Sequence, residues 1–364
     1  MNSETGKSSR ILVLTASLVV AAFLLLSVEI VLRMAGFRYD NRPRYMEFNF
    51  PNPHELHEIF EYDPQTYWRL KPGVKMGADI EPINSKGFRG PEFADQKAEG
   101  TKRLVTLGDS VTFGGAVSYP SVLADCLDGG WEVINAGVPG YSSFQGKRLF
   151  ETRITQLVPD VVTVMFGWND HWLSKNYPDS RQHPEALSEL PSVVSFVRNI
   201  RIFQLLGYAT NKLVSQPDTD NPNAVNRVST DEYRVFLDNL VDTIQRTGAT
   251  AVLITAPAAL DRGKAPTYLY DLGFVKRIEG ESEEEAAQRL RKLHADYNDI
   301  VRAVTKEMNV PLVDLESQWY DIGTRGYFRD PWRDVTHPNE KGYRLIGNTL
   351  CDTIKTIVVT QTPE

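Results

Sequence analysis

A serine lies in a glycine-flanked tripeptide, Gly108-Asp109-Ser110, directly after a short apolar run. At the end of a strand, such a turn would present the hydroxyl of Ser110 at the edge of a sheet, where a serine can act as a nucleophile. Gly, Asp and Ser are also ordinary turn residues, so the tripeptide alone is weak evidence. Because a serine hydroxyl is a poor nucleophile at neutral pH, this hypothesis requires a base elsewhere in the chain.

An aspartate near the carboxyl end, Asp334, stands three residues before His337. In one turn, the carboxylate can hold one ring nitrogen of the imidazole while the other nitrogen faces a serine, which fixes the tautomer and stabilises the imidazolium. Pro338 follows, and we expect it to set the start of a final helix. The alternative interpretation is that Asp334 and His337 cap that helix. Taken with Ser110, the pair predicts a nucleophile, a base and an orienting carboxylate.

Two further blocks could stabilise an oxyanion. The block 167–170 (Gly-Trp-Asn-Asp) follows an apolar run and carries the side-chain amide of Asn169, and the block 135–140 (Asn-Ala-Gly-Val-Pro-Gly) follows another. Amide and backbone N–H groups aimed at a developing negative charge contribute a few kcal/mol each. Turn formation is the alternative role for these residues. Each block follows a predicted strand or precedes the last helix, so we expect all of them to meet at one sheet edge.

The elements that would position these residues follow an alternating pattern. Short apolar, β-branched runs predict five buried strands, and the stretches between and after them predict helices. The strands are expected at 103–107, 131–135, 161–166, 250–255 and 310–315, and the helices at 119–127, 144–157, 231–246, 283–308 and about 339–357. Alternating strands and helices indicate an α/β fold with a parallel sheet covered on both faces, that is, a three-layer flavodoxin-like domain.

The remaining segments are long connections. Residues 33–100 are rich in Pro, Gly, Asn and aromatic residues and predict turns and short strands that link the amino end to a body at 101–364. Insertions at about 174–230 and 258–282 interrupt that body. In such sheets ligands bind where long loops gather beyond the carboxyl ends of the strands, so both insertions could shape a substrate cleft. Surface elaboration without substrate contact is the alternative.

The amino end is strongly apolar, and residues 11–28 carry no charged side chain. With Glu29 near one interface, an apolar helix over 11–32 is long enough to cross a bilayer, so we expect a transmembrane signal anchor after a cytoplasmic tail at 1–10. A cleaved signal peptide is the alternative, although its apolar region is usually shorter. No cysteine stands near Leu32, so the sequence does not indicate a lipoprotein.

The orientation of this helix has evidence on both sides. Lys7 and Arg10 precede it, whereas four arginines follow it within the next twelve residues (Arg33, Arg38, Arg42 and Arg44), which by count favours a cytoplasmic body. A short basic tail before a long domain resembles a signal anchor, and long domains are translocated largely regardless of charge. We therefore expect a single-pass membrane protein with its catalytic domain on the periplasmic or extracellular side.

Composition excludes several classes of partner and site. The 364 residues include 41% hydrophobic and 24% charged side chains, which is typical of a folded protein, and the net charge of −7 disfavours nucleic acid as a partner. The two cysteines, Cys126 and Cys351, stand far apart; they indicate neither a zinc knuckle nor a disulfide framework and are expected to be buried apolar residues. The histidines outside the blocks lack paired ligand spacing, so no metal site and no cofactor are expected.

The order of the four blocks, GDS, N-x-G-x-x-G, G-x-N-D and D-x-x-H, resembles that of the SGNH hydrolases, also called GDSL lipases and esterases. The resemblance extends from residue 103 to about residue 357. It implies a serine nucleophile, a histidine base with an orienting aspartate, and an oxyanion hole made of the nucleophile's backbone N–H, a glycine N–H and an asparagine amide. In this sequence these are Ser110, His337, Asp334, Gly140 and Asn169.

Three details of the resemblance bear on the site. Gly140 fits the family spacing from Asn135, although Gly137 lies close to it. Trp168 stands inside the third block and His171 closely follows it, and both could face the substrate. The amino-terminal helix and residues 37–100 look like those of bacterial envelope members of the family, which often act on acylated glycans or lipids.

The function expected from these residues is hydrolysis of O-acyl esters through an acyl-enzyme. One alternative is an O-acyltransferase that uses the same residues to pass the acyl group to an envelope glycan. A second alternative, from another class, is a silent glycan-binding or scaffold module on the same fold. Intact Ser110, Asn169, Asp334 and His337 argue against the silent module.

Overall fold

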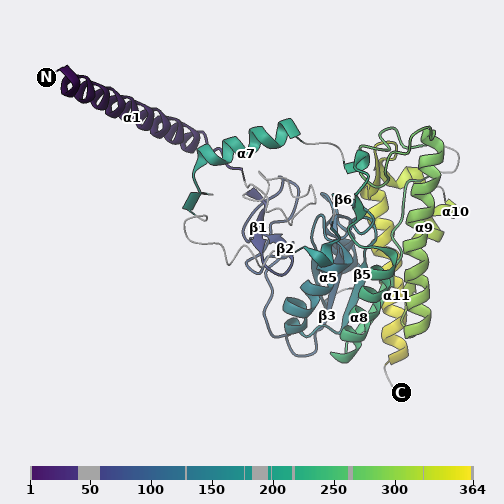
Figure 1. Cartoon of the computed structure of the whole chain (residues 1–364). Coiled ribbons are helices and arrows are strands. Elements are labelled where there is room, and N and C mark those ends of the chain that lie inside the picture. Colours follow the sequence, from purple (N-terminus) through teal and green to yellow (C-terminus); the bar gives the residue numbers. More distant parts are fainter. Residues whose placement is uncertain are drawn as a thin grey trace.

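The computed structural model of the chain describes residues 2–39, 58–127, 129–175, 177–182, 196–197, 199–214, 218–260, 265–322 and 324–361. A long helix, α1 (Asn2–Met34), projects from an α/β body (Figure 1). The central sheet of that body has five parallel strands in the order β4-β3-β5-β8-β9. They are β3 (Lys102–Gly108), β4 (Trp131–Gly137), β5 (Val161–Met165), β8 (Thr250–Ile254) and β9 (Leu312–Val313). This is the flavodoxin-like order, and it confirms the predicted three-layer fold.

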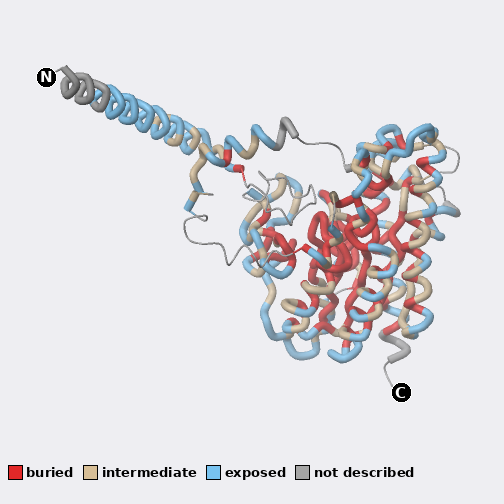
Figure 2. The backbone as a smooth tube through the Cα atoms, viewed as in Figure 1, coloured by how far each residue is buried: buried red, intermediate tan, exposed pale blue. Residues whose placement is uncertain are grey.

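Apolar side chains cover both faces of the sheet. Val105 and Leu107 of β3 lie in one buried cluster and Leu104 lies in the other, because successive residues of a strand point to opposite faces. The buried part of the chain is concentrated on the sheet and the inner sides of the helices (Figure 2). A parallel sheet with helices on both faces accounts for the continuous apolar runs seen in the sequence.

The helices form mostly where the sequence predicts them. The principal ones in the body are α4 (Tyr119–Leu127), α5 (Ser143–Leu149), α8 (Thr230–Arg246), α9 (Glu283–Met308), α10 (Leu315–Ile322) and α11 (Glu340–Gln361). Ser229 and Ser282 cap α8 and α9 through capping boxes with Glu232 and Glu285. The helix expected over 144–157 changes geometry: α5 continues as a π-helix (Phe150–Ile154) and a 3-10 turn (Thr155–Leu157).

Three small antiparallel pairs lie outside the central sheet: β1 (Phe60–Asp63) with β2 (Tyr67–Leu70), β6 (Leu173–Ser174) with β7 (Val225–Asn226), and β10 (Phe328–Asp330) with β11 (Asp334–Pro338). The remaining short elements are α3 (Ser110–Phe113) and 3-10 turns at Asp179–Arg181, Asp218–Asp220 and Thr324–Tyr327. The first pair confirms that short strands occur within 33–100. Residues 40–57 of that segment lie outside the described residues.

The expectation that the two cysteines are unpaired apolar residues is wrong. Cys126 and Cys351 form a disulfide, with an S–S distance of 2.03 Å and a sequence separation of 225. The bond joins α4 to α11, which pack against each other. Spacing along the sequence could not reveal this pair, because it depends on the contact between two helices from opposite ends of the domain.

The final helix begins close to where it is expected, but the role of Pro338 differs from the expectation. Pro338 does not begin α11 but ends β11, where it lies opposite Phe328. The residue before the helix is Asn339, whose side-chain oxygen accepts a hydrogen bond from the Gly342 N–H at 3.1 Å. Because proline has no N–H to donate to a ladder, it is confined to edge strands, and β11 is one strand of a two-stranded sheet. The Asp334–His337 segment is therefore part of a strand pair, not a helix cap.

The amino-terminal helix is exposed along most of its described side chains. Its segment Leu12–Met34 is long and apolar enough to cross a membrane, and none of it is buried in the protein. Near its end, α1 contacts α7 (Arg201–Val214), a helix from the first insertion (Figure 1). The first insertion thus places a second helix, α7, beside the carboxyl-terminal end of α1.

Candidate active site

Ser110 is the first residue of α3, immediately beyond the carboxyl end of β3. The turn is fixed by Asp109, whose Oδ1 accepts a hydrogen bond from the Val111 N–H at 2.8 Å. A Cβ atom added at Gly108 would lie 2.0 Å from Oγ1 of Thr112 and 2.7 Å from the Met165 carbonyl oxygen. Only glycine fits there, so the glycine of the tripeptide allows the chain to pass between β5 and the helix that begins with Ser110.

Ser110, His337 and Asp334 form a hydrogen-bonded chain. The Ser110 Oγ atom lies 2.8 Å from Nε2 of His337, and Nδ1 of His337 lies 2.9 Å from both carboxylate oxygens of Asp334. Because an ionised carboxylate only accepts hydrogen bonds, Nδ1 carries the proton and Nε2 is free to accept the serine proton. This is the arrangement of a nucleophile, a general base and an orienting carboxylate.

The carboxylate of Asp334 is held within its own turn. Its Oδ1 atom also accepts hydrogen bonds from the backbone N–H groups of Thr336, at 3.1 Å, and His337, at 3.0 Å. Burial opposes ionisation of Asp334, but the hydrogen bonds and charge of His337 and these backbone donors keep its pKa below the ordinary value. The spacing of three residues between Asp334 and His337 therefore fixes the carboxylate, its charge and the ring orientation together.

Asn169 lies at the same edge, beyond the carboxyl end of β5, and is almost completely buried. Its Nδ2 donates a hydrogen bond to Oδ2 of Asp109 at 3.0 Å. An amide nitrogen has two hydrogens, so the second N–H of Asn169 stays available in the cleft. Burial raises the pKa of Asp109 to about 6, against the opposing effects of the Val111 N–H, the charge of His337 and the Asn169 amide.

The geometry distinguishes the two glycines of the block 135–140. Gly140 lines the cleft beside Ser110 and has a φ of 81°. Gly137 instead ends β4, donates its N–H to Oδ1 of Asn135 at 3.0 Å, and has no room for a Cβ atom against the backbone of Phe113. Since its N–H is already used, Gly137 is poorly suited to bind an oxyanion, and Gly140 is the better candidate.

A buried arginine supports the turn that carries Gly140. Arg227 donates from Nη1 to the Gly140 carbonyl oxygen at 2.6 Å and forms an ion pair with Asp179 at 2.7 Å, and neither side chain is exposed by more than 1%. The indole N–H of Trp68 donates to the neighbouring Pro139 carbonyl oxygen at 3.2 Å. Both Arg227 and Asp179 come from the insertion at 174–230, so that insertion contacts and supports the turn that carries Gly140. Sequence reasoning did not single out any of these three residues.

Asp170 is a second supporting residue that the sequence analysis did not assign. Its Oδ1 accepts hydrogen bonds from the N–H and hydroxyl of Ser143, and its Oδ2 accepts one from the Gly167 N–H at 3.0 Å. Complete burial raises the pKa of Asp170 to about 7, against the hydrogen bonds from Ser143. The residue links the block 167–170 to the start of α5. Its position directly after Asn169 was the only signal in the sequence.

The triad opens into a cleft of about 540 Å³, a size suited to a small-molecule ligand. Ser110, Gly140, Asn169 and His337 share this cleft. Its other walls are mainly apolar: Ile59, Phe60, Met76, Pro139, Trp168, Trp172, Leu272 and Phe274, with Asp271, Arg333, Asp334 and Thr336 adding polar groups. Part of the wall therefore comes from the segment 33–100 and part from the insertion at 258–282. Trp168 is among the lining residues, and its contact with substrate stays a prediction.

His171 does not face the substrate cleft, contrary to the expectation. It is fully buried, its Nε2 lies 3.2 Å from Nδ1 of His294, and its ring packs 5.1 Å from that of Trp168. His294 stacks on Trp168 at 4.1 Å. Burial lowers the pKa of His294 to about 4, and burial together with the neighbouring His294 holds the pKa of His171 well below its ordinary value, so both rings are neutral. The two histidines pack against the ring of Trp168. The proximity of His171 to Asn169 in the sequence did not predict the direction in which the His171 side chain points.

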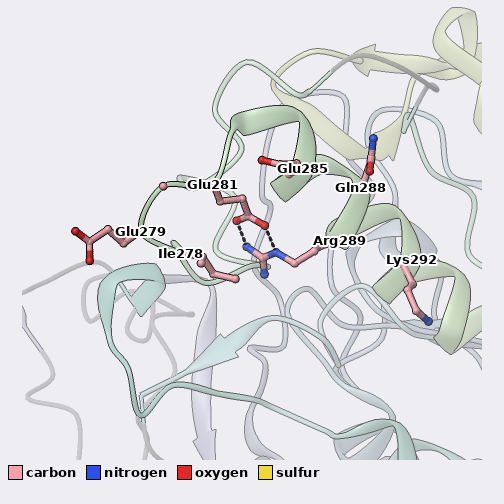
Figure 3. Close-up of a pocket in the computed structure, with 8 residues that line it drawn as sticks. Ile278, Glu279, Glu281, Glu285, Gln288, Arg289 and Lys292 are labelled. Carbon is pink, nitrogen blue, oxygen red and sulfur yellow. Dashed lines mark hydrogen bonds and ion pairs between the residues drawn. The ribbon is translucent and has the colours of Figure 1, made fainter.

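A second hollow lies at the amino end of α9, around Glu281 and Arg289 (Figure 3). Arg289 donates to Glu281 at 2.5 Å and 2.6 Å, so the strongest positive group in this hollow is already paired. None of the residues that form the triad lines it. Among the residues that the structure describes, no group of three or more His, Cys, Asp or Glu side chains is arranged to hold a metal ion.

Residues 106–345 match the GDSL-like Lipase/Acylhydrolase family. This match covers more than half of the chain and includes Ser110 and His337, so the chain belongs to that family. The fold and the family together define an SGNH-type hydrolase that acts on ester bonds. Acyl esters are accordingly its class of substrate.

Individual relatives are more distant. The chain is 24% identical over 228 residues to the uncharacterized lipoprotein YqeF of Bacillus subtilis (strain 168), an alignment that covers 60% of this chain and 72% of the relative. Among solved structures, it is similar to a lipase/acylhydrolase from Enterococcus faecalis, with 19% identity, a TM-score of 0.43, and coverage of 70% of this chain and 96% of that one. An acetylxylan esterase from Geobacillus stearothermophilus matches with 17% identity, a TM-score of 0.42, and coverage of 70% and 95%.

Proposed function

We propose that the chain is a serine esterase that cleaves O-acyl esters through an acyl-enzyme formed on Ser110. The observation that carries this proposal is the continuous hydrogen-bonded chain from Ser110 through His337 to Asp334, with distances of 2.8 Å and 2.9 Å. Such a chain lets a neutral imidazole remove the serine proton while the carboxylate stabilises the imidazolium that results. A silent binding module would not need this geometry.

The reaction proceeds in two halves. Nε2 of His337 takes the proton from Ser110 Oγ as that oxygen attacks the ester carbonyl carbon, and the carbonyl oxygen becomes an oxyanion. The N–H groups of Ser110 and Gly140 and the free N–H of Asn169 stabilise this charge. The intermediate then collapses, and the imidazolium protonates the departing alkoxide. Water enters, His337 removes its proton, and the same steps in reverse order release the carboxylic acid and restore Ser110.

The substrate is an ester with an apolar part on one side of the scissile bond. The apolar walls of the cleft, among them Trp168, Trp172 and Phe274, can bury an acyl chain or an apolar alcohol. Acylated envelope glycans and acylated lipids both carry such esters. Transfer to a glycan hydroxyl uses the same acyl-enzyme and differs only in the acceptor, so the products distinguish it from hydrolysis.

We further propose that α1 anchors the protein in a membrane, with the catalytic domain on the periplasmic or extracellular side. The apolar, unburied segment Leu12–Met34 supports the anchor. The Cys126–Cys351 disulfide supports the orientation, because disulfides persist in oxidising compartments and are rare in the cytosol. This observation outweighs the arginines that follow α1, since long domains are translocated largely regardless of charge.

Labelling with a fluorophosphonate probe tests the nucleophile directly. Full-length protein in detergent should be labelled covalently, and the Ser110→Ala variant should not. A panel of esters from acetyl to long acyl chains, with acetylated glycans included, then identifies the substrate, and product analysis with and without an alcohol acceptor separates hydrolysis from transfer. Absence of labelling in correctly folded wild-type protein would overturn the serine-esterase proposal.

A further inference from the structure

Helix α7 carries an apolar stripe that is half-buried at Ile202 and faces away from the protein from Leu205 onward. Ile202, Leu205, Leu206 and Ala209 recur with the spacing of one helix face, i, i+3, i+4 and i+7. Leu206 is 56% exposed and Leu205 36% exposed, and just before the helix Phe196 is 69% exposed. A helix of a water-soluble domain normally turns its apolar face inward, so this stripe requires another environment.

The opposite side of α7 is the side that contacts the protein. The side-chain oxygen of Gln204, which is buried, accepts a hydrogen bond from the Tyr39 N–H at 3.1 Å. The ring of Tyr208 packs edge-on against Tyr39 at 5.4 Å and against Phe37 at 6.3 Å. These residues lie just beyond the end of α1, so the chain uses the polar and aromatic side of α7 for packing and leaves the apolar stripe outside.

Helix α7 and the residues just before it are hydrogen-bonded directly to the carboxyl-terminal end of α1. The Ile202 N–H donates to Oε2 of Glu29 at 3.1 Å, and Nη2 of Arg33 donates to the Asn199 carbonyl oxygen at 3.1 Å. Figure 1 shows α7 beside the end of α1 that leads into the body. The exposed stripe of α7 thus belongs to a helix that contacts the end of α1, and the apolar surface of α1 is expected to contact lipid.

Three arginines gather at this junction. Arg201 donates from Nη1 to the side-chain oxygen of Gln204 at 2.9 Å, and the same oxygen accepts from the N–H of Tyr39, the residue after Arg38. Arg33 reaches the Asn199 carbonyl oxygen two residues before Arg201. Burial lowers the pKa of Arg201, and the charges of Arg38 and Arg33 lower it further. Glu29 pairs with Arg33 at 2.7 Å, so the cluster keeps a net positive charge. Arginine donates several hydrogen bonds in a planar fork that suits phosphate oxygens. A positive cluster beside an apolar stripe matches the phosphate and acyl layers of a bilayer surface.

We infer that α7 is an interfacial helix, whose face formed by Ile202, Leu205, Leu206 and Ala209 enters the surface of the bilayer that α1 spans, while Arg33, Arg38 and Arg201 bind anionic lipid phosphates. This rests on the proposed membrane anchor. Interfacial helices bury their apolar face about 5–10 Å into the boundary between headgroups and acyl chains. The helix therefore gives the first insertion a second contact with the membrane beside the spanning helix.

Site-specific fluorescence in the full-length protein tests the inference. Both cysteines of the sequence are in the disulfide, so a single added cysteine can be labelled with bimane. Leu206→Cys and Ala209→Cys report on the α7 stripe, Leu18→Cys reports on the spanning part of α1, and Val235→Cys on α8 is the matched control, an apolar residue 52% exposed on the body. Each variant is reconstituted into vesicles of phosphatidylcholine with or without phosphatidylglycerol, and its melting curve verifies folding.

The expected result separates three depths. Lipids brominated near the headgroup should quench labels at 206 and 209, lipids brominated deep in the chain should quench the label at 18, and aqueous iodide should quench only the label at 235. The emission of labels at 206 and 209 should shift further to the blue when phosphatidylglycerol is present, since the arginines favour anionic phosphates.

Other outcomes overturn the inference in distinguishable ways. Lipid quenching at 18 combined with iodide quenching at 206 and 209 would leave the anchor intact and refute the interfacial helix. Protection of 206 and 209 from both quenchers would show that a protein covers the stripe, such as a second copy of the chain. Iodide quenching at 18 would refute the anchor itself and the interfacial helix with it. Equal blue shifts in neutral and anionic vesicles would refute the role of the arginines.

Discussion

The amide of Asn169 donates a hydrogen bond to the carboxyl group of Asp109, the residue directly before Ser110, at 3.0 Å. Asp109 follows β3 and Asn169 follows β5, so the bond connects the ends of two neighbouring strands. Because Oδ1 of Asp109 also accepts from the Val111 N–H, one carboxyl group fixes both the nucleophile turn and the oxyanion amide. Two parts of the proposed catalytic apparatus are therefore positioned by one buried side chain.

The first prediction concerns Asn169. Asn169→Ala should lower kcat for an ester substrate by roughly a hundredfold or more with little change in KM, because the amide acts mainly on the transition state. Steady-state kinetics on the purified protein measures both constants. A rise in KM at unchanged kcat would instead make Asn169 a residue that positions the substrate.

The second prediction concerns the triad. Ser110→Ala and His337→Ala should each abolish ester turnover without unfolding the protein, because the two residues act as one proton-transfer unit. Asp334→Asn should lose less of the ester turnover, since the histidine remains in place. Turnover with circular dichroism as the folding control tests this. Near-wild-type turnover by Ser110→Ala would show that another residue is the nucleophile.

The third prediction uses the pH dependence of stability. In the folded state the pKa of Asp109 is raised from 3.8 to about 6, so Asp109 contributes stability that is fully present below the unfolded pKa and is lost as the pH rises through about 6. A shift of this size corresponds to about 3 kcal/mol over that range. Asp109→Asn cannot ionise, so its Tm relative to the wild type should rise between about pH 4 and about pH 7.5.

The control for this prediction separates charge from hydrogen bonding. Asparagine has one acceptor oxygen and cannot accept from both Val111 and Asn169, so Asp109→Asn should lose stability by an amount that does not depend on pH. Only the change with pH of the Tm difference between variant and wild type reports the ionisation of Asp109. A Tm difference that is constant across the range would mean that Asp109 ionises in the folded protein as it does in the unfolded chain.

The sheet and the triad could be predicted from sequence because each depends on local pattern. The five apolar runs and the helices at 119–127 and 283–308 appear where their periodicity places them. Ser110, Asn169 and His337 could be assigned because each follows or joins a predicted element, and a parallel sheet brings the carboxyl ends of its strands together. Long-range contacts were not needed for these inferences.

What the sequence could not predict depends on contacts between distant segments. Cys126 and Cys351 pair because α4 packs on α11, and Arg227 reaches Gly140 because the first insertion folds back under the site. His171 was expected in the cleft, but its direction is set by packing against His294 and Trp168. Neither residue spacing nor periodicity carries information about such contacts.

The fourth prediction concerns the disulfide. Replacing Cys126 and Cys351 together with serine should lower the free energy of unfolding by about 2–5 kcal/mol, because the bond closes a loop of 225 residues and restricts the unfolded chain. Urea denaturation of wild type and variant, with and without reductant, measures the difference. The variant should be insensitive to reductant. Equal stability of the oxidised wild type and the variant would show that the bond does not constrain the unfolded chain.

The fifth prediction concerns the anchor. The full-length chain should remain in the membrane fraction through carbonate extraction, because the proposed anchor Leu12–Met34 is long and apolar enough to span the bilayer. A fragment that begins at Arg38 should be released from the membrane and remain active, since the triad and the residues that line its cleft all lie downstream of residue 38. Through the apolar stripe of α7 it should still bind anionic vesicles reversibly. Extraction of the full-length chain by carbonate would contradict a spanning helix.

The orientation of that helix can be measured in the same cells. A reporter enzyme that works only outside the cytoplasm, fused after Glu364, should be active, and a cytoplasmic reporter at the same position should be silent. The arginines after α1 are the specific reason to expect the reverse, whereas the Cys126–Cys351 disulfide favours the outside. Alkylation of the chain under non-reducing conditions provides an independent check, because an external body should contain no free thiol. Activity of the cytoplasmic reporter alone would reverse the localisation and leave the ester chemistry of Ser110 unchanged.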